Sequence, residues 1–222
     1  MDRNPLNHLW DYADKWEIRM GFLSSLLRRV IFSFDAFLCH VYGVYTFSEE
    51  ADCILRLRLS NSEKSVDLPG GKVNPGDDLL EIHLWNEHIP PLLASESSMV
   101  WGSRTLRLFI QGLRQVAQQL NHDPGMARIR AIHGEMIFLS TARNPVRGRQ
   151  MERLGFTVLP YHSKAGAFGE FWENFYSWWL MWAYNPLSVQ GRRLTSNHRL
   201  EIWMSIDAFK ERYNAAISST SD

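Results

Sequence analysis

The apolar residues of this chain recur at helical spacing in three long segments. These segments cover residues 5–44, with a break expected near Gly21, residues 103–121 and residues 168–184. Apolar side chains three or four positions apart lie on one face of a helix, so each segment predicts a helix that buries that face. The clearest stripe is that of the second segment: Leu106, Phe109, Ile110, Leu113, Val116, Ala117 and Leu120.

Shorter segments alternate between apolar and polar residues, or are rich in apolar ones and bounded by glycine and proline, which predicts strands. They cover residues 52–60, 65–68, 79–85, 129–139, 156–161 and 200–204. The first three follow one another closely and predict an antiparallel meander. A short helix expected between the fourth and fifth predicts a strand–helix–strand unit with a parallel pair. The predicted fold is therefore α+β, with a single mixed sheet.

No repeat or low-complexity linker divides the chain of 222 residues. We therefore predict one α+β domain over residues 48–217, preceded by a helical extension over residues 1–47 and followed by a polar tail over residues 218–222. A last helix is expected to begin near Ile206. This length is sufficient to bury a core without a disulfide or a structural metal.

The charge balance narrows the expected partners. Lysine plus arginine and aspartate plus glutamate number 24 each, so no overall field attracts nucleic acid, and no nucleic-acid partner is predicted. The first residues lack the pattern of a signal peptide, and the two cysteines suggest reduced thiols, which together predict a cytoplasmic protein. Charged residues interrupt the two most apolar segments, so neither is predicted to span a membrane.

The strand expected at residues 79–85 carries the candidate chemistry. Leu80, Ile82 and Leu84 alternate with Glu81 and His83, so the ionisable pair would share one face. A carboxylate that fixes one tautomer of an imidazole is an arrangement suited to a general base, and Glu81 and His83 are the candidate catalytic residues. The structural alternative is a hydrogen-bonded pair on a solvated strand face. Their spacing from His88 does not suit metal ligands, and no metal is predicted.

Five further residues are candidates for ligand binding. Asn86 and His88 follow the strand at its exit, where open sheets commonly bind ligands. Ser103 and Arg104 begin the predicted helix, whose amides would attract an anion. Trp178 lies off the apolar stripe of its helix and would be exposed to a sugar or an acyl chain. The structural alternatives are a capped helix with a solvated arginine and an aromatic core.

Four separated blocks of sequence carry a resemblance to a known family. They are Gly76–Asn86, Ala131–Gly134, Arg153–Phe156 and Glu201–Ser205. Through them the chain resembles the YkoP-like domain family from its first strand to its end. That family is bacterial, has no established activity, and occurs alone or fused to polysaccharide deacetylases. The resemblance implies a role near cell-envelope carbohydrate metabolism and supplies no catalytic residue.

A looser resemblance links the chain to the N-acetyltransferase (GNAT) superfamily. The order of the expected elements is similar, and Arg149–Phe156 is similar to the late helix of that fold. In such enzymes the strand corresponding to residues 79–85 leads into a glycine-rich loop that binds the pyrophosphate of the cofactor. Residues 99–104 hold one glycine, Gly102, in the corresponding place. This resemblance implies acetyl-CoA or another acyl-CoA as the cofactor.

Three functional hypotheses follow from these observations. The first is a soluble module that uses no cofactor and binds a small carbohydrate or acyl group, in connection with envelope polysaccharide metabolism. The second is an acyltransferase, in which Glu81 or His83 deprotonates an amine or hydroxyl while Ser103 and Arg104 hold the phosphates of CoA. The third is a peripheral membrane or scaffold protein, and a membrane surface is the least favoured partner.

Overall fold

The computed structural model describes residues 7–139, 146–190 and 197–218. The chain divides into two compact units, residues 1–41 and 42–222. Helix α1 (Asn7–Tyr42) makes up the described part of the first unit and is 36 residues long. It continues through Gly21, so the expected break is wrong. A glycine inside a helix costs only about 1 kcal/mol relative to alanine, which a long helix tolerates.

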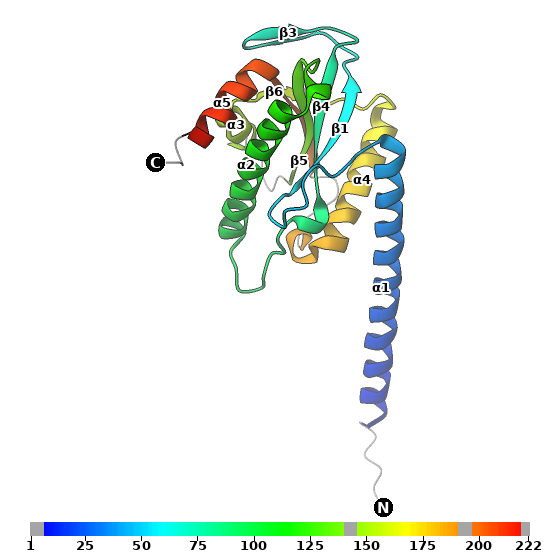
Figure 1. Ribbon diagram of the computed structural model, residues 1–222. Helices are drawn as coiled ribbons and strands as arrows, with labels where there is room; N and C mark the ends of the chain where they lie inside the picture. The colour runs from blue at the N-terminus through cyan, green and yellow to red at the C-terminus, as the bar shows by residue number, and fades with distance from the viewer. Residues whose placement is uncertain (1–6, 140–145, 191–196, 219–222) are drawn as a thin grey trace, which may run out of the picture. The chain divides into compact units, whose positions relative to one another are not determined.

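A mixed sheet of five strands, in the order β1-β4-β5-β7-β6, forms the centre of the second unit (Figure 1). Its strands are β1 (Leu55–Asn61), β4 (Asp78–Leu84), β5 (Ala131–Leu139), β6 (Thr157–Pro160) and β7 (Asn197–Ser205). β4 and β5 are parallel, and the other neighbours are antiparallel. The α+β fold class with a mixed sheet is confirmed.

The predicted three-stranded meander is wrong, because β1 and β4 pair directly. The segment between them forms a separate hairpin of β2 (Val66–Leu68) and β3 (Gly71–Val73). Ser62 and Asp77 close the base of this hairpin, with a backbone hydrogen bond of 2.9 Å from the Ser62 amide to the Asp77 carbonyl. Gly70 takes a φ of 86° at its tip, which a glycine adopts without strain. The tight turn at Gly70 lets β2 and β3 pair with each other as a second, two-stranded sheet.

The expected pairing of the strand–helix–strand unit also needs correction. Helix α3 (Val146–Arg153) does connect β5 to β6, as predicted. However, β7 lies between these two strands and pairs antiparallel with both. The two strands therefore run in the same direction without touching. The position of β7 could not be predicted from the local sequence pattern of β5 and β6, because β7 comes from a later part of the chain.

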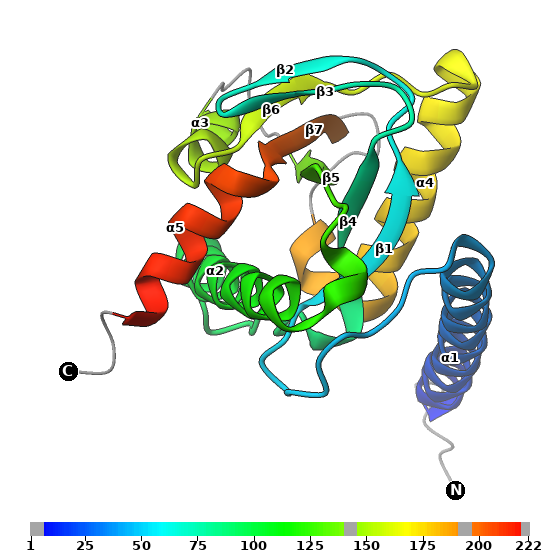
Figure 2. The same ribbon diagram turned by 45° about the horizontal axis from the view of Figure 1, so that its top comes forward.

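Different elements cover the two faces of the central sheet (Figure 2). Helices α2 (Ser98–His122) and α5 (Ile206–Ser218) pack on one face, together with α3. The hairpin and α4 (Gly166–Tyr184) lie over the other face. The main core fills the first face and includes Leu57, Leu80, Ile132 and Ile202 from the sheet, Leu113 and Val116 from α2, and Phe209 from α5.

Single-turn helices complete the fold: η1 (Asn86–His88), η2 (Pro124–Met126) and η3 (Pro186–Val189). One glycine is required by close packing inside the sheet. A Cβ atom on Gly134 would lie 2.9 Å from Cγ1 of Ile82 and 3.2 Å from its carbonyl oxygen. Gly134 therefore lets β5 approach β4 at the point where their parallel ladder ends.

Candidate functional site

Polar residues gather on the second face of the sheet, in register across four strands. Arg58 of β1 lies opposite Glu81 of β4, and Glu81 lies opposite His133 of β5. His133 in turn lies opposite Trp203 of β7. Because side chains alternate along a strand, these four project to the face away from the main core. The register alone brings them into one row.

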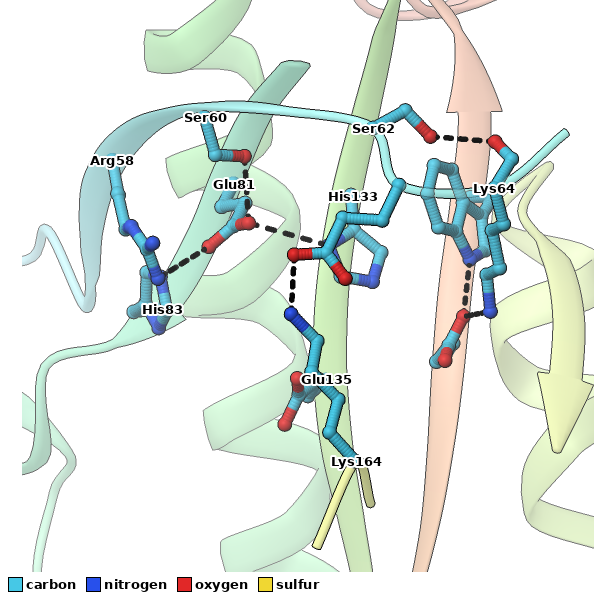
Figure 3. Close-up of polar contacts among 12 residues, drawn as sticks. Arg58, Ser60, Ser62, Lys64, Glu81, His83, His133, Glu135 and Lys164 are labelled. Carbon is cyan, nitrogen blue, oxygen red and sulfur yellow. Dashed lines mark hydrogen bonds and ion pairs between the residues drawn. The ribbon is translucent and has the colours of Figure 1, made fainter. Parts of the chain in front are cut away.

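Glu81 is the centre of this row (Figure 3). The Ser60 hydroxyl donates a hydrogen bond of 2.7 Å to its Oε1 atom. Its Oε2 atom lies 3.3 Å from Nε2 of His83 and 3.4 Å from Nη1 of Arg58. Nδ1 of His133 lies 3.8 Å from Oε1. One carboxylate therefore contacts two imidazoles, a hydroxyl and a guanidinium group.

These contacts determine the charge of Glu81. Burial by itself would raise the pKa of this carboxyl group. The contacts with His133, His83 and Ser60 and the charge of Arg58 outweigh burial and hold the pKa of Glu81 well below its usual range. A carboxylate with so low a pKa is a weak base at neutral pH. Its geometry suits a group that orients an imidazole.

His133 is enclosed but lacks hydrogen-bond partners. Its ring stacks at a tilt on that of Trp203, with 4.2 Å between the centroids, and its side chain is 13% exposed. Within the described part of the chain, neither of its ring nitrogens has a hydrogen-bond partner, and both are shielded from solvent. Buried polar atoms in native proteins are nearly always paired. Two unpaired nitrogens on one ring therefore point to a ligand or water as the partner.

A second ionisable group lies two residues further along β5. Glu135 shares the face of His133, and Nη1 of Arg199 lies 3.2 Å from its Oε2 atom. Although 40% of the side chain is exposed, burial of the carboxyl group raises the pKa of Glu135, and the positive charge of Arg199 only partly opposes this. The carboxyl groups of Glu81 and Glu135 thus have pKa values displaced in opposite directions.

Helix α4 and the loop before it hold the Arg199 side of the face. The Arg199 guanidinium group donates hydrogen bonds to the Ser177 hydroxyl at 2.7 Å and to the Glu173 carbonyl at 2.6 Å. Its Cζ atom lies 5.7 Å from the centroid of the Tyr161 ring. Burial, with the nearby charges of Glu135 and Glu173, raises the pKa of Tyr161, which stays a neutral phenol at physiological pH.

The hairpin covers the other end of the face. Its apolar residues Val66, Leu68 and Val73 pack on Leu79, Ala131 and Trp203. Lys64 leads into it and donates a 2.5 Å hydrogen bond to Glu201, which also accepts one of 2.8 Å from the Trp203 indole. Lys164, before α4, forms an ion pair with Glu63 (Figure 3). The polar row is therefore enclosed by protein on several sides.

The structure brings together the two residues predicted to be catalytic, Glu81 and His83. Sequence reasoning missed His133, Glu135 and Ser60, which share their face. The signal was present, because His133 and Glu135 stand at alternate positions of a predicted strand, as Glu81 and His83 do. What the sequence lacked was the parallel pairing of β4 and β5, which places these two alternations side by side.

Asn86 and His88 belong to a different cluster. β4 ends at Leu84, and both residues lie in η1. Nδ1 of His88 lies 2.9 Å from the Cys53 carbonyl, and its ring stacks on Trp85 with centroids 3.5 Å apart. His88 therefore has a structural environment of its own, separate from the contacts of Glu81.

Ser103 and Arg104 do not begin their helix, so the expected anion site at a helix N-terminus is wrong at this position. α2 begins at Ser98 because Ser97 caps it, its side chain accepting a hydrogen bond from the Val100 amide. Ser103 consequently lies inside the helix. Arg104 donates hydrogen bonds of 3.0 Å to the Pro91 carbonyl and to Glu96, and so fastens the preceding loop.

Trp178 is not the exposed aromatic residue of α4. Its side chain is half-buried, and its indole nitrogen is shielded from solvent without a hydrogen-bond partner in the part of the chain that the structure describes. The exposed aromatic residues lie at the start of the helix: Phe168, Phe171 and Trp172 are 71%, 53% and 50% exposed. The apolar stripe of α4, which was expected in the core, is therefore exposed to solvent at the start of the helix.

The described residues also bear on metal binding and on membrane insertion. No group of three or more His, Cys, Asp or Glu side chains within residues 7–139, 146–190 and 197–218 has a metal-binding arrangement. In the same ranges, no helix combines the length and the apolar character that a membrane crossing requires. This holds for the apolar segments around Phe34 and Trp179 as well.

The fold and this face define a class: an α+β protein whose mixed sheet has a packed apolar face and an enclosed polar one with paired imidazole and carboxylate groups. Within that class the chain belongs to the YkoP family, since the model of the YkoP domain matches residues 24–213. The match begins inside α1 and takes in the whole central sheet, which confirms the resemblance carried by the four sequence blocks. No curated protein and no solved structure matches the chain.

Proposed function

We propose that this YkoP protein binds a neutral, hydroxyl-rich small molecule, such as a carbohydrate unit of the cell envelope, on the polar face of its sheet. The observation that carries this proposal is the enclosed imidazole of His133, whose nitrogens lack hydrogen-bond partners among the described residues. A ligand hydroxyl can donate a hydrogen bond to an imidazole or accept one from it. Such a ligand would supply the missing partners.

The charges of the face favour a neutral ligand over an anionic one. Four described cations on this side of the sheet already contact carboxyl groups: Arg58 contacts Glu81, Lys64 contacts Glu201, Lys164 contacts Glu63, and Arg199 contacts Glu135. An anion would have to compete with these carboxyl groups for the same donors. A carbohydrate competes less, because its hydroxyls bond to neutral and charged groups alike.

Ligand-dependent thermal stabilisation tests this proposal. We expect α-D-glucose or N-acetyl-D-glucosamine to raise the Tm of the full chain, since a ligand at 100 times its Kd stabilises a protein by about 2.7 kcal/mol. His133→Leu removes both ring nitrogens and should abolish the shift. Glu211→Gln is the matched control, because Glu211 is an exposed carboxylate on α5, on the opposite side of the sheet, and should leave the shift unchanged. A Tm that neither sugar moves in the unmodified chain contradicts the proposal.

A second candidate is acyl transfer from acyl-CoA, and the geometry of β4 and β5 favours it. Their parallel ladder covers only Leu79–Ile82 and Ala131–Gly134, although β5 continues to Leu139. The strands therefore stop pairing toward their carboxyl ends, which is where open sheets bind ligands. An imidazole oriented by Glu81 near that point suits deprotonation of an acceptor group.

The same assay separates the two candidates. Acetyl-CoA and CoA at millimolar concentration should raise the Tm under the acyltransferase proposal and leave it unchanged under the first. Stabilisation by the cofactor, with release of a free thiol when an amine acceptor is added, would favour acyl transfer. A sugar-dependent shift without any response to CoA would favour carbohydrate binding alone.

A further inference from the structure

The polar face carries the two kinds of group that a proton-transfer reaction needs. His133 presents ring nitrogens that lack hydrogen-bond partners among the described residues, with Glu81 near Nδ1, and Glu135 presents a carboxyl group on the same face of the same strand. Residues two apart on a strand lie about 6.6 Å apart. A ligand with two oxygens on one carbon atom can span this distance, because each oxygen can form a hydrogen bond of about 2.8 Å to one of the two side chains.

We propose that His133 and Glu135 form a catalytic acid–base pair that opens and closes the ring of a reducing sugar. This inference rests on the proposed function, of which it names the substrate class and the reaction. The hemiacetal carbon of a sugar bears two oxygens, the hydroxyl and the ring oxygen. At this carbon the movement of two protons is sufficient to break a carbon–oxygen bond.

The step balances within the sugar and these two side chains. His133 takes the proton of the anomeric hydroxyl while the carbon–oxygen double bond forms. The bond from that carbon to the ring oxygen breaks, and the ring oxygen takes the proton of the Glu135 carboxyl group. Ring closure on the other face of the carbonyl returns both protons, so that the product is the opposite anomer and each side chain regains its first state.

The surroundings of each group suit its role. Glu81, at 3.8 Å from Nδ1 of His133, stabilises the imidazolium that forms when the ring accepts a proton. Around Glu135, burial raises the pKa and so favours the protonated acid, with Glu173 and Glu81 acting in the same direction and Arg199 and His133 against it. An enzyme separates an acid from a base by such opposed environments.

Arg199 contacts Glu135 and opposes the rise of its pKa. Its guanidinium group is itself held by the Ser177 hydroxyl and the Glu173 carbonyl of α4, so its position is fixed by the fold. It stabilises the Glu135 carboxylate that remains after the proton has been given away. Glu81 and Arg199 are therefore positioning residues, and the reacting groups are His133 and Glu135.

Polarimetry of freshly dissolved α-D-glucose and N-acetyl-α-D-glucosamine tests the inference with the full chain. We expect the protein to accelerate mutarotation of at least one sugar. His133→Gln and Glu135→Gln should each slow the protein-dependent rate by about 100-fold or more, the usual contribution of a general acid or base. Glu211→Gln should keep the full rate, and circular dichroism should show that every variant is folded.

The pH dependence distinguishes catalysis from a structural role. The rate should fall at high pH, where an ionised Glu135 donates no proton. Glu135→Gln should remove the fall at high pH from its residual rate. Sugars that stabilise the protein without any change in mutarotation overturn this inference and leave the binding proposal standing. If neither sugar alters stability or rate, both proposals fail.

Discussion

The two faces of the central sheet are built from alternate residues of the same strands, yet their chemistry is opposite. On one face Leu80, Ile132 and Ile202 are fully buried among the helices α2 and α5. On the other, Glu81, His133 and Glu201 are enclosed although they are polar or charged. The first face lowers the free energy of the fold by burying apolar area. The second buries groups that have to be desolvated, which costs free energy.

This difference separates stability from function along a single strand. Ile132 and His133 are neighbours in β5, and their side chains project to opposite faces. A protein retains buried polar groups with incomplete pairing mainly where they act on something else. We therefore expect substitutions on the apolar face to change stability, and substitutions on the polar face to change ligand binding and rate.

The largest effect on stability is expected on the apolar face. The Ile132 side chain is 0% exposed and belongs to the core that the sheet forms with α2 and α5. Ile132→Ala should therefore lower the free energy of unfolding by about 2–5 kcal/mol. Urea denaturation measures this directly. Ile132→Val is the graded control and should cost about 0.5–1.5 kcal/mol. A loss below 1 kcal/mol for the alanine variant would mean that this face is not the main core.

Such a difference between the faces was partly predictable from the sequence. Alternation in residues 79–85 assigned Leu80 and Ile82 to the core correctly, and both are buried. The helical stripe of α2 was equally clear, and Leu113, Val116 and Ala117 are fully buried. Local periodicity reports which side of an element is apolar, because burial and spacing are linked. It does not report which strand lies beside it, and so the meander and the β5–β6 pair were wrong.

A smaller effect, dependent on pH, is expected at Glu81. Glu81→Gln removes a carboxylate that accepts a hydrogen bond from Ser60 and contacts three other polar side chains, which should cost about 1–3 kcal/mol at pH 7. The pKa of Glu81 is lowered in the folded state, so the stability that its charge adds is fully present above the pKa of the unfolded chain, about 4.3. It is lost as the pH falls toward the lower folded value.

Denaturation of both proteins at pH 7 and pH 3 measures this dependence. The difference between the unmodified chain and Glu81→Gln should be large at pH 7 and decline steadily below pH about 4. Glu211→Gln, on the other side of the sheet, should show no comparable dependence. An equal difference at both pH values would mean that the charge of Glu81 is not what stabilises this row.

The polar face was less predictable than the core, for a physical reason. Glu81 and His83 belong to one strand, so their alternation could be seen in the sequence. His133, Glu135 and Trp203 come from other strands, and they meet Glu81 only through the register of β4, β5 and β7. A site formed across strands depends on pairing, which is determined by contacts between distant segments. The helix start expected at Ser103 was also wrong, because Ser97 caps α2 and places its first residue at Ser98.

His133→Leu should change stability by less than about 1 kcal/mol, and in the stabilising direction. The ring nitrogens of His133 are shielded from solvent without hydrogen-bond partners in the described chain, so an apolar side chain of similar size removes a desolvation cost. Glu81 keeps its contacts with Ser60 and Arg58. Urea denaturation at pH 7, without ligand, measures this change. A loss of more than 2 kcal/mol would assign His133 to the structural framework rather than to ligand binding.

The smallest effect is expected where the polar face reaches solvent. Lys164 and Glu63 form an ion pair whose side chains are 79% and 68% exposed. Because water and salt screen such a pair, Lys164→Met should lower stability by only about 0.2–0.5 kcal/mol at low ionic strength, and by less in 1 M NaCl. Urea denaturation at both salt concentrations tests this. A larger, salt-independent loss would show that this pair is part of the enclosure of the polar face, which would then extend further toward solvent than the row from Arg58 to Trp203.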